Sequence, residues 1–464
     1  MRRDRQVDAV SAPVPGGAVP PFRILYEDNH LLVVEKPVNV PVQADATGDD
    51  DLLSQCRRYI KAAYGKPGEA FVALVHRLDR PVGGVMVFAR TSKAAARLTA
   101  QFKAHTAGKR YAAVVEGCPP PEGRLVDWLY KDEKSFSSAV VPEGTAGARR
   151  AELRFDTLAA RDGRALLDVS LRTGRPHQIR VQLAHAGFPI EGDQRYNPAA
   201  RPGAQIRLWA YALTLRHPTL GEEMTFFSLP QGDGFSAFPA QLALLPAFAV
   251  CRGVYVDDEL LVVDKHAGVE VETDLAGALE SIVGTVYPVH RLDANTEGLV
   301  AFARTEQMRD RLLQAFRTHE GVEKTYRAVL AAVPERREGT LEHWLLKDPE
   351  RAFVRVVPAG TPGAQQTRLS YRVLQVKDGL ALAELSLFTG RTHQIRVQMA
   401  AIGCPVLGDD RYGDREANHR FHARRQQLLA ARLTLFGRTF VSGRRLSLQE
   451  TGTGTMGPPG GGAF

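Results

Sequence analysis

The sequence repeats over long segments, and this repeat limits the possible folds more than any other feature. Val75–Asp79 reads VHRLD and recurs as Val289–Asp293. Thr173–Gln182 reads TGRPHQIRVQ and recurs, with one change, as Thr389–Gln398. The motifs keep their order, and their period is far longer than the ~20–50 residues of a solenoid repeat. The chain is therefore predicted to contain two copies of a whole domain.

Shorter matches accompany these motifs. Lys109–Tyr111 matches Lys324–Tyr326, and Leu31–Lys36 matches Leu260–Lys265. The segment between the copies carries the Gly and Pro residues of a linker together with some apolar residues that are expected to pack, and both ends of the chain are rich in Gly, Pro and small residues. We predict a disordered tail at 1–20, a first domain at 21–232, a linker at 233–249, a second domain at 250–450 and a disordered tail at 451–464.

Each copy combines many short strands with few helices. Two apolar runs in Arg23–Lys36 predict a hairpin, and apolar residues at helical spacing in Ser92–His105 predict a helix. This mixture favours an α+β fold. The other predicted strands are Val85–Ala89, Tyr111–Glu116, Ala165–Leu171, Leu208–Leu215 and Thr225–Leu229.

A further short helix is predicted at Pro176–Ala186. Its apolar residues recur at helical spacing, and its proline stands where the first turn of a helix tolerates one. The N-terminus of this helix would carry Arg175, His177 and Arg180. Such an end offers N–H donors and a positive dipole, so it suits an anion or a carboxylate.

Asp79 is the first candidate for chemistry. It precedes a stretch with a proline and two glycines, so as a single residue it would be read as a turn or cap residue paired with Arg77. Its recurrence at Asp293 favours a functional site, although a structural turn would also be preserved by duplication. A carboxylate of this kind could act as a nucleophile beside an arginine. Tyr111 and Tyr326 could stack on a flat substrate or be aromatics of an edge strand.

The sequence offers no metal site and no cofactor loop. His177 and His393 each lack a partner at metal-ligand spacing. His419 and His422 lie in an arginine-rich segment and are interpreted as solvated or phosphate-facing. The four cysteines form no C-x-x-C pair, and there is no glycine-rich phosphate loop. We therefore expect neither a metal nor a cofactor.

At these motifs the sequence resembles the RluA family of RNA pseudouridine synthases. That family carries His-Arg-Leu-Asp, then Lys-x-Tyr, then Gly-Arg-Thr/Pro-His-Gln-Ile-Arg, and both copies contain the cores of all three in this order. The resemblance covers roughly residues 22–230 and 250–448. It implies an α+β pseudouridine-synthase fold in each copy, with a mixed β-sheet, flanking helices and a central cleft.

The resemblance also implies a reaction, the isomerisation of uridine in RNA to its C-glycoside without a metal or an organic cofactor. Asp79 and Asp293 would be the nucleophiles. The target base would be flipped out, since chemistry on a stacked base is otherwise blocked. The other implied roles are base stacking and proton transfer for Tyr111 and Tyr326, pairing with the aspartate for Arg180 and Arg396, and RNA contact at or near the gap left by the flipped nucleotide for Arg77, Arg291, Arg175 and Arg391.

Two stretches depart from the family pattern. The loop after the aspartate has Val82-Gly83 in the first copy and Thr296-Glu297 in the second, where the family commonly has Thr and Ser. A Leu-His-Ala stretch of many members is Trp209-Ala210 in the first copy and Leu429–Ala431 in the second, without the histidine. The short segment before residue 21 predicts that the N-terminal RNA-binding module of some relatives is absent.

Charge and composition are compatible with an RNA partner but do not identify it. Lys and Arg outnumber Asp and Glu by 60 to 52, an excess of +8 spread over 464 residues. The sequence shows no signal-peptide core and no apolar stretch of ~18 residues. We expect a cytoplasmic monomer whose partner is ribosomal or transfer RNA, and neither a membrane nor DNA.

Three hypotheses remain open at this point. In the first, both copies are catalytic. In the second, one copy catalyses and the other is an RNA-binding platform, for which the arginines of Arg411–Arg425 could hold phosphates. In the third, the chain is a non-catalytic RNA-folding factor that reuses the fold.

Overall fold

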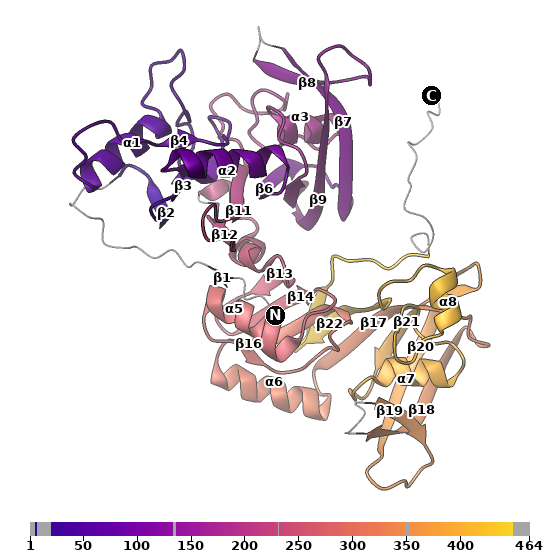
Figure 1. Ribbon diagram of the computed structural model, residues 1–464. Helices are drawn as coiled ribbons and strands as arrows, with labels where there is room; N and C mark the ends of the chain where they lie inside the picture. The colour runs from indigo at the N-terminus through magenta and orange to yellow at the C-terminus, as the bar shows by residue number, and fades with distance from the viewer. Residues whose placement is uncertain (1–4, 7–19, 133–135, 231, 349–352, 449–464) are drawn as a thin grey trace. The chain divides into compact units, whose positions relative to one another are not determined.

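The computed structural model describes residues 5–6, 20–132, 136–230, 232–348 and 353–448. The chain divides into two compact units, Met1–Pro246 and Ala247–Phe464. Figure 1 shows the first unit in indigo to magenta and most of the second in orange to yellow. The division lies inside 233–249, the segment predicted as a linker.

The first unit is built on one mixed sheet. Its path is β2-β3-β5-β11-β6-β10-β9-β7-β8, with β4 beside β5, and β12 between β11 and β1. Neighbours along the path are antiparallel except β5 and β11, which are parallel. The strands are β1 (Arg5–Gln6), β2 (Arg23–Glu27), β3 (Leu31–Lys36), β4 (Ala73–Leu74), β5 (Gly83–Ala89), β6 (Gly108–Glu116), β7 (Glu122–Asp132), β8 (Ser137–Val141), β9 (Arg149–Arg161), β10 (Arg164–Leu171), β11 (Leu208–Arg216) and β12 (Glu223–Phe227). The helices are α1 (Leu52–Ala63), α2 (Ser92–Lys103), α3 (Gln178–His185) and α4 (Pro239–Ala243).

The second unit repeats this topology, with the path β13-β14-β16-β22-β17-β21-β20-β18-β19. The parallel pair is now β16 and β22. The strands are β13 (Cys251–Val256), β14 (Leu260–Lys265), β15 (Tyr287–Pro288), β16 (Glu297–Ala303), β17 (Val322–Leu330), β18 (Glu338–Asp348), β19 (Phe353–Val357), β20 (Gln365–Lys377), β21 (Leu380–Leu387), β22 (Leu428–Leu435) and β23 (Arg438–Val441). The helices are α5 (Ala276–Val283), α6 (Glu306–Thr318), α7 (Gln394–Ala401) and α8 (Arg415–Arg420). The duplication of the sequence is thus also a duplication of topology.

Apolar side chains cover both faces of the inner strands. On β3, Leu32 and Val34 belong to a core cluster that also contains apolar residues of α1 and α3, whereas Leu31 and Val33 pack in a cluster with residues of α2. Alternate residues of a strand point to opposite faces, so a strand covered on both sides is apolar throughout. This explains the uninterrupted apolar run at the start of β3.

The predicted elements of the first copy are present, and the α+β prediction is confirmed. The hairpin is β2 and β3, and the five strands are β5, β6, β10, β11 and β12. The helix predicted at Ser92–His105 is α2, capped at Thr91. The helix predicted at Pro176–Ala186 is shorter than expected. It begins only at Gln178, because His177 has a left-handed backbone with φ of 54° and cannot belong to the helix.

The segment predicted as a linker is folded, and the prediction for the first tail needs correction. The linker segment is folded into a 3-10 turn at Asp233–Phe235, α4 and a second turn at Leu245–Ala247, because its apolar side chains are buried. Arg5 and Gln6 form β1 and pair in parallel with β12, so the prediction of disorder is wrong for these two residues. Pro20 is described as well, and the rest of both predicted tails lies outside the described residues.

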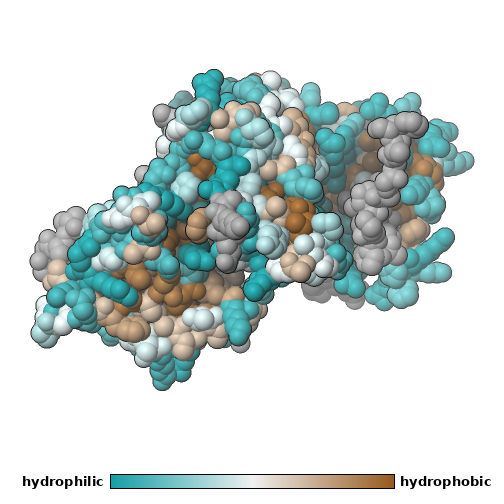
Figure 2. Space-filling view, turned by 90° about the horizontal axis from the view of Figure 1, so that it is seen from above, coloured by the Kyte–Doolittle hydropathy of each residue, from teal (hydrophilic) through white to brown (hydrophobic). Residues whose placement is uncertain are grey.

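The surface seen in Figure 2 carries hydrophilic side chains between smaller apolar areas. In the part of the chain that the structure describes, no helix combines the length and the apolar composition needed to cross a bilayer.

Candidate active site

The repeated motifs meet near the middle of the sheet in the first unit. The loop between β4 and β5 carries Arg77 and Asp79, β6 carries Tyr111, and α3 carries Arg180. These residues approach one another because β5, β11 and β6 are neighbours in the sheet and α3 follows β10, the next strand along. All four side chains line a cavity of about 530 Å³, a size in the range of small-ligand pockets, ~300–1,000 Å³.

A buried lysine holds the loop that carries Asp79. Lys36 is fully buried at the end of β3. Its ammonium donates hydrogen bonds to the carbonyl oxygens of Pro37, Arg80 and Val82 at 2.9, 2.9 and 2.8 Å. Burial lowers the pKa of Lys36 to about 7, although the charge of Asp79 opposes this shift. The position of the aspartate is therefore set by contacts with the core of the sheet.

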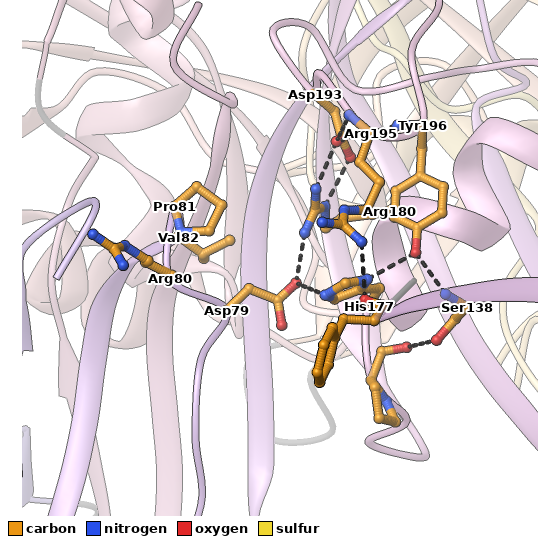
Figure 3. Close-up of polar contacts among 12 residues, drawn as sticks. Asp79, Arg80, Pro81, Val82, Ser138, His177, Arg180, Asp193, Arg195 and Tyr196 are labelled. Atoms are coloured by element: carbon orange, nitrogen blue, oxygen red, sulfur yellow. Dashed lines mark hydrogen bonds and ion pairs between the residues drawn. The ribbon is translucent and has the colours of Figure 1, made fainter. Parts of the chain in front are cut away.

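Arg180 connects Asp79 to a second carboxylate, that of Asp193. Its Nη1 donates to Oδ2 of Asp79 at 3.1 Å, while Nε and Nη2 donate to the two oxygens of Asp193 at 2.8 and 2.7 Å (Figure 3). The side chain of Asp193 is 0% exposed and that of Asp79 is 27% exposed. A bidentate pair fixes the plane of a guanidinium. Asp193 thus orients Arg180, and Arg180 orients the partly exposed carboxylate of Asp79.

One oxygen of Asp79 remains available to a substrate. Arg180 and His177 both approach Oδ2, and none of the described residues donates a hydrogen bond to Oδ1. The side chain of Arg80 points away from this carboxylate in Figure 3 and pairs with Asp45 and Asp49. The site therefore presents an anchored carboxylate with one free oxygen at the cavity.

His177 forms the third side of the ion-pair cluster. Its Nδ1 lies 2.7 Å from the hydroxyl of Tyr196, which accepts a hydrogen bond from the N–H of Ser138 and so can donate its own proton to Nδ1. A neutral imidazole bonded in this way carries its proton on Nε2, the atom 3.9 Å from Oδ2 of Asp79. Burial lowers the pKa of His177, which favours this neutral form, although Asp79 opposes the shift.

Tyr111 supplies an aromatic wall of the cavity. It is 8% exposed, and burial raises the pKa of its hydroxyl above the usual range, with a further increase from the charge of Asp79. Lys109, two residues earlier on β6, also lines the cavity, and burial lowers its pKa. The phenol is therefore neutral at neutral pH and offers a flat ring beside the carboxylate.

The two arginines predicted to contact RNA lie at the rim of this cavity. Arg77 is exposed and lines it. Arg175 is partly buried just before α3, where its Nε donates to the carbonyl oxygen of Arg150 at 3.2 Å and its N–H donates to Gln178 at 3.0 Å. Both arginines therefore border the cavity that contains Asp79.

The second unit repeats the ion-pair cluster. Arg396 donates to Asp293 at 3.0 Å and to both oxygens of Asp409 at 2.6 and 2.8 Å. His393 again has a left-handed backbone, with φ of 55°, and its Nδ1 lies 2.8 Å from the hydroxyl of Tyr412. The arginine contacts are therefore repeated in the second unit, but Nε2 of His393 lies 3.8 Å from Oδ1 of Asp293, whereas His177 approaches Oδ2 of Asp79.

The cavity beside this second cluster is much smaller. Asp293, Tyr326, Arg396 and the exposed Arg291 and Arg391 line a space of about 70 Å³. Burial also raises the pKa of the Tyr326 hydroxyl, with Asp293 contributing. The two units thus share the polar residues of the site but differ in the volume of the cavity beside them.

Several residues of the site had no predicted role although they lie in the repeated motifs. Asp193 and Tyr196 recur as Asp409 and Tyr412, and Lys36 recurs as Lys265. Recurrence in both copies is the sequence signal for these residues, because their contacts with Arg180, His177 and the loop around Asp79 form only in the fold. Lys265 is also fully buried and donates to three backbone carbonyl oxygens at 2.7 to 3.0 Å.

The two departures from the family pattern lie against each other in the fold. Gly83 is opposite Trp209 where β5 and β11 pair, and a Cβ on Gly83 would lie 2.3 Å from the indole ring. In the second unit Glu297 is opposite Leu429 at the corresponding place. The first unit therefore pairs a glycine with a large aromatic side chain, whereas the second pairs two side chains of similar, intermediate size.

No group of three or more His, Cys, Asp or Glu among the described residues could hold a metal ion. His419 and His422 are both exposed, which agrees with their interpretation as solvated residues.

Comparison with known proteins adds independent evidence. A family model described as RNA pseudouridylate synthase matches residues 30–185 and 259–401. Ribosomal large subunit pseudouridine synthase D of Zymomonas mobilis is 31% identical over 218 residues, which is 44% of this chain and 68% of that protein. The dual-specificity RNA pseudouridine synthase RluA of Salmonella typhi is 36% identical over 209 residues, which is 44% of this chain and 90% of that protein.

Among solved structures, human RNA pseudouridylate synthase domain containing 4 is 24% identical with a TM-score of 0.39, and the match covers 46% of this chain and 90% of that one. The family model matches more than half of the chain, once within each unit. The chain therefore belongs to the RNA pseudouridylate synthase family, as a tandem duplication of the family's domain.

Proposed function

We propose that the chain isomerises uridine to pseudouridine in structured RNA, with Asp79 as the nucleophile of the first unit and Asp293 as that of the second. The observation that supports this most is the partly exposed carboxylate of Asp79, oriented by Arg180, which the buried Asp193 holds in turn. The same chain of contacts occurs around Asp293.

In the proposed reaction the bond between N1 of uracil and C1′ of the ribose breaks, and a bond between C5 and C1′ forms. C5 loses a proton and N1 gains one, so the reaction is an isomerisation and needs no other reactant. Asp79 initiates the cleavage, through either an adduct with the sugar or a glycal. Tyr111 stacks on the base while it turns and takes part in removal of the C5 proton.

Arginines at the rim would hold the RNA. Arg77 and Arg291 would occupy the space that the flipped uridine leaves, and Arg175 and Arg391 would contact the backbone nearby. The relatives named above include a ribosomal large-subunit enzyme and a dual-specificity RNA enzyme. Ribosomal RNA and transfer RNA, the two partners expected from the sequence, are the substrate classes to compare.

The test uses total RNA from a strain that lacks the gene, treated with the purified full chain and mapped for pseudouridine. Asp79→Asn and Asp293→Asn are expected to abolish product at different uridines, and the double variant at both. Asp156→Asn is a suitable control, because Asp156 lies on β9 and lines neither cavity. Full product with the double variant would show that these aspartates are not the nucleophiles.

A second candidate function has support from the size of the cavities. In the first unit about 530 Å³ is available beside the carboxylate, whereas about 70 Å³ is available in the second. The second unit would then serve as an RNA-binding platform, with the exposed arginines 415, 420, 424 and 425 on phosphates. In that case Asp79→Asn alone abolishes all product, and Asp293→Asn leaves it intact.

A further inference from the structure

A second cavity in the first unit adjoins the active-site cavity. It has a volume of about 760 Å³ and shares Arg77, Gly174 and Arg175 with the first as lining residues. From there it extends over the end of β7 and the start of β9, where Tyr130 and Arg149 line it. A polynucleotide that places one base in the first cavity would therefore pass a neighbouring nucleotide across the second.

Tyr130 gives this second cavity an aromatic surface. The side chain is 42% exposed. Gly147 supports one edge of the ring, since a Cβ on that glycine would lie 3.4 Å from Cε2 of Tyr130. A half-exposed ring that is fixed along one edge is a suitable platform for a nucleic-acid base, and stacking of this kind does not depend on which base is present.

The cavity also carries an excess of positive charge. Arg77, Lys131, Arg149 and Arg175 line it, against the single carboxylate of Asp132. Within the described ranges, no carboxylate lies within ion-pair distance of Arg77, Arg149 or Arg175. Burial and the nearby charge of Arg149 both lower the pKa of Arg175.

Neighbouring arginines on the same sheet are neutralised instead. Arg124 and Arg150 share the carboxylate of Glu152, at 2.9 and 2.8 Å. Arg77, Arg149 and Arg175 take no part in this pairing. They are therefore suited to bind an anion from outside, such as a phosphate.

We propose that this second cavity binds a nucleotide next to the target uridine, with its base stacked on Tyr130 and its phosphate held by Arg149 and Arg175. The proposal rests on the proposed function, because it takes the target uridine to lie beside Asp79. It makes Tyr130 and Arg149 substrate-binding residues of the first unit, outside the repeated motifs.

The second unit provides an internal comparison. Leu346 takes the place of Tyr130, and a Cβ on Gly363 would lie 3.5 Å from its Cδ1, as Gly147 lies beside the tyrosine ring. Gln365 takes the place of Arg149, since Leu345 is opposite Gln365 in the same way as Leu129 is opposite Arg149. The second unit keeps the backbone of this region without the aromatic platform or this cation. The two units should therefore differ in how tightly they bind the nucleotide next to the target.

The test compares Tyr130→Leu and Arg149→Gln, which introduce residues that the same backbone already accepts in the second unit. The substrate is an RNA fragment containing the uridine whose conversion requires Asp79. Tyr130→Leu is expected to raise KM by about tenfold, with a smaller effect on kcat, because a stacked base is lost. Tyr130→Phe should restore KM, and Phe71→Leu, at an exposed aromatic outside both cavities, should leave the kinetics unchanged.

Arg149→Gln is expected to reduce the slope of log affinity against log salt by about 0.7, the value for one phosphate of a single strand. Product at the Asp293-dependent uridine should not change with either variant. An unchanged KM for Tyr130→Leu, or a Tyr130→Phe variant as impaired as Tyr130→Leu, would overturn the stacking site. Failure of the proposed function itself would give a different result. In that case the conversion of no uridine would require Asp79, and this result would overturn the subsite as well.

Discussion

In the first unit, Nη1 of Arg180 donates a hydrogen bond of 3.1 Å to Oδ2 of Asp79, a residue 101 positions earlier in the chain. The other side of the guanidinium is taken by Asp193, whose side chain is 0% exposed. Arg180 therefore has two structural roles. It orients the carboxylate at the cavity, and it neutralises a carboxylate inside the fold.

Two substitutions of Arg180 should separate its effect on Asp79 from its effect on Asp193. Arg180→Lys keeps a positive charge but loses the planar fork, so it should lower Asp79-dependent product formation by about 10- to 100-fold, the equivalent of one hydrogen bond between charged groups at about 1.5–3 kcal/mol. Arg180→Ala leaves Asp193 buried without its partner and should also lower the free energy of unfolding by ~3–5 kcal/mol.

Product mapping and urea unfolding measure the two effects. Arg124→Ala is the matched control, because Arg124 pairs with Glu152 at a 53% exposed position, where an ion pair contributes little. An Arg180→Lys variant with normal product formation would contradict the positioning role.

Much of the fold and of the site follows from the repeat. A motif present twice predicts both the two-domain organisation and the residues around Asp79. The sequence did not predict β7, β8 and β9, because polar and charged residues interrupt their apolar residues and leave no long apolar run. Nor did it reveal the second cavity. Tyr130 and Arg149 meet there through strand pairing, and neither recurs in the second copy.

Helix α3 shows a second limit of the sequence pattern. Its apolar spacing predicts the helix but not the left-handed backbone of His177, which accompanies a contact with Tyr196. The hydroxyl of Tyr196, 19 residues later, holds the imidazole outside the helix. Local periodicity carries no information about a contact of this kind.

Gly84→Ala should disrupt the parallel pairing of β5 and β11. Gly84 has φ of +121°, and an added Cβ would lie 2.2 Å from the carbonyl oxygen of Ala210. Because backbone strain and a clash with the backbone act together, we expect a loss of about 4 kcal/mol or more in the free energy of unfolding. Gly48→Ala is the control, since φ is +75° there but no atom lies within 4 Å. A Gly84→Ala variant that unfolds like Gly48→Ala would rule out the close approach.

Gly83 and Trp209 should show strong energetic coupling. Gly83→Ala alone places a Cβ 2.3 Å from the indole ring and should be destabilising. Trp209→Leu alone removes buried aromatic surface and should also be destabilising. The double variant resembles the arrangement of Glu297 and Leu429, so a double-mutant cycle from urea unfolding should give a favourable coupling of about 1–3 kcal/mol. Additive losses would mean that the two departures are independent.

The stability contributed by Lys36 should depend on pH. Burial lowers its pKa to about 7 in the folded chain, below the ~10.4 of a free lysine. Between these values the unfolded chain binds more protons at this group than the folded chain, so the free energy of unfolding rises with pH. Relative to Lys36→Met, the native chain should therefore gain up to about 4 kcal/mol between pH 7 and pH 10. Below pH 7 the group is protonated in both states and the difference should be constant.

Lys265 provides the comparison for this experiment, because burial lowers its pKa only to about 8. The difference in the free energy of unfolding between the native chain and Lys265→Met should begin to rise at a higher pH than for Lys36, and its total change should be smaller. Lys36→Met also frees the carbonyl oxygens of Arg80 and Val82, so Asp79-dependent product should fall at every pH. The difference in the free energy of unfolding between the native chain and Lys36→Met could instead be independent of pH. That result would mean that the three carbonyl acceptors keep Lys36 protonated despite its burial.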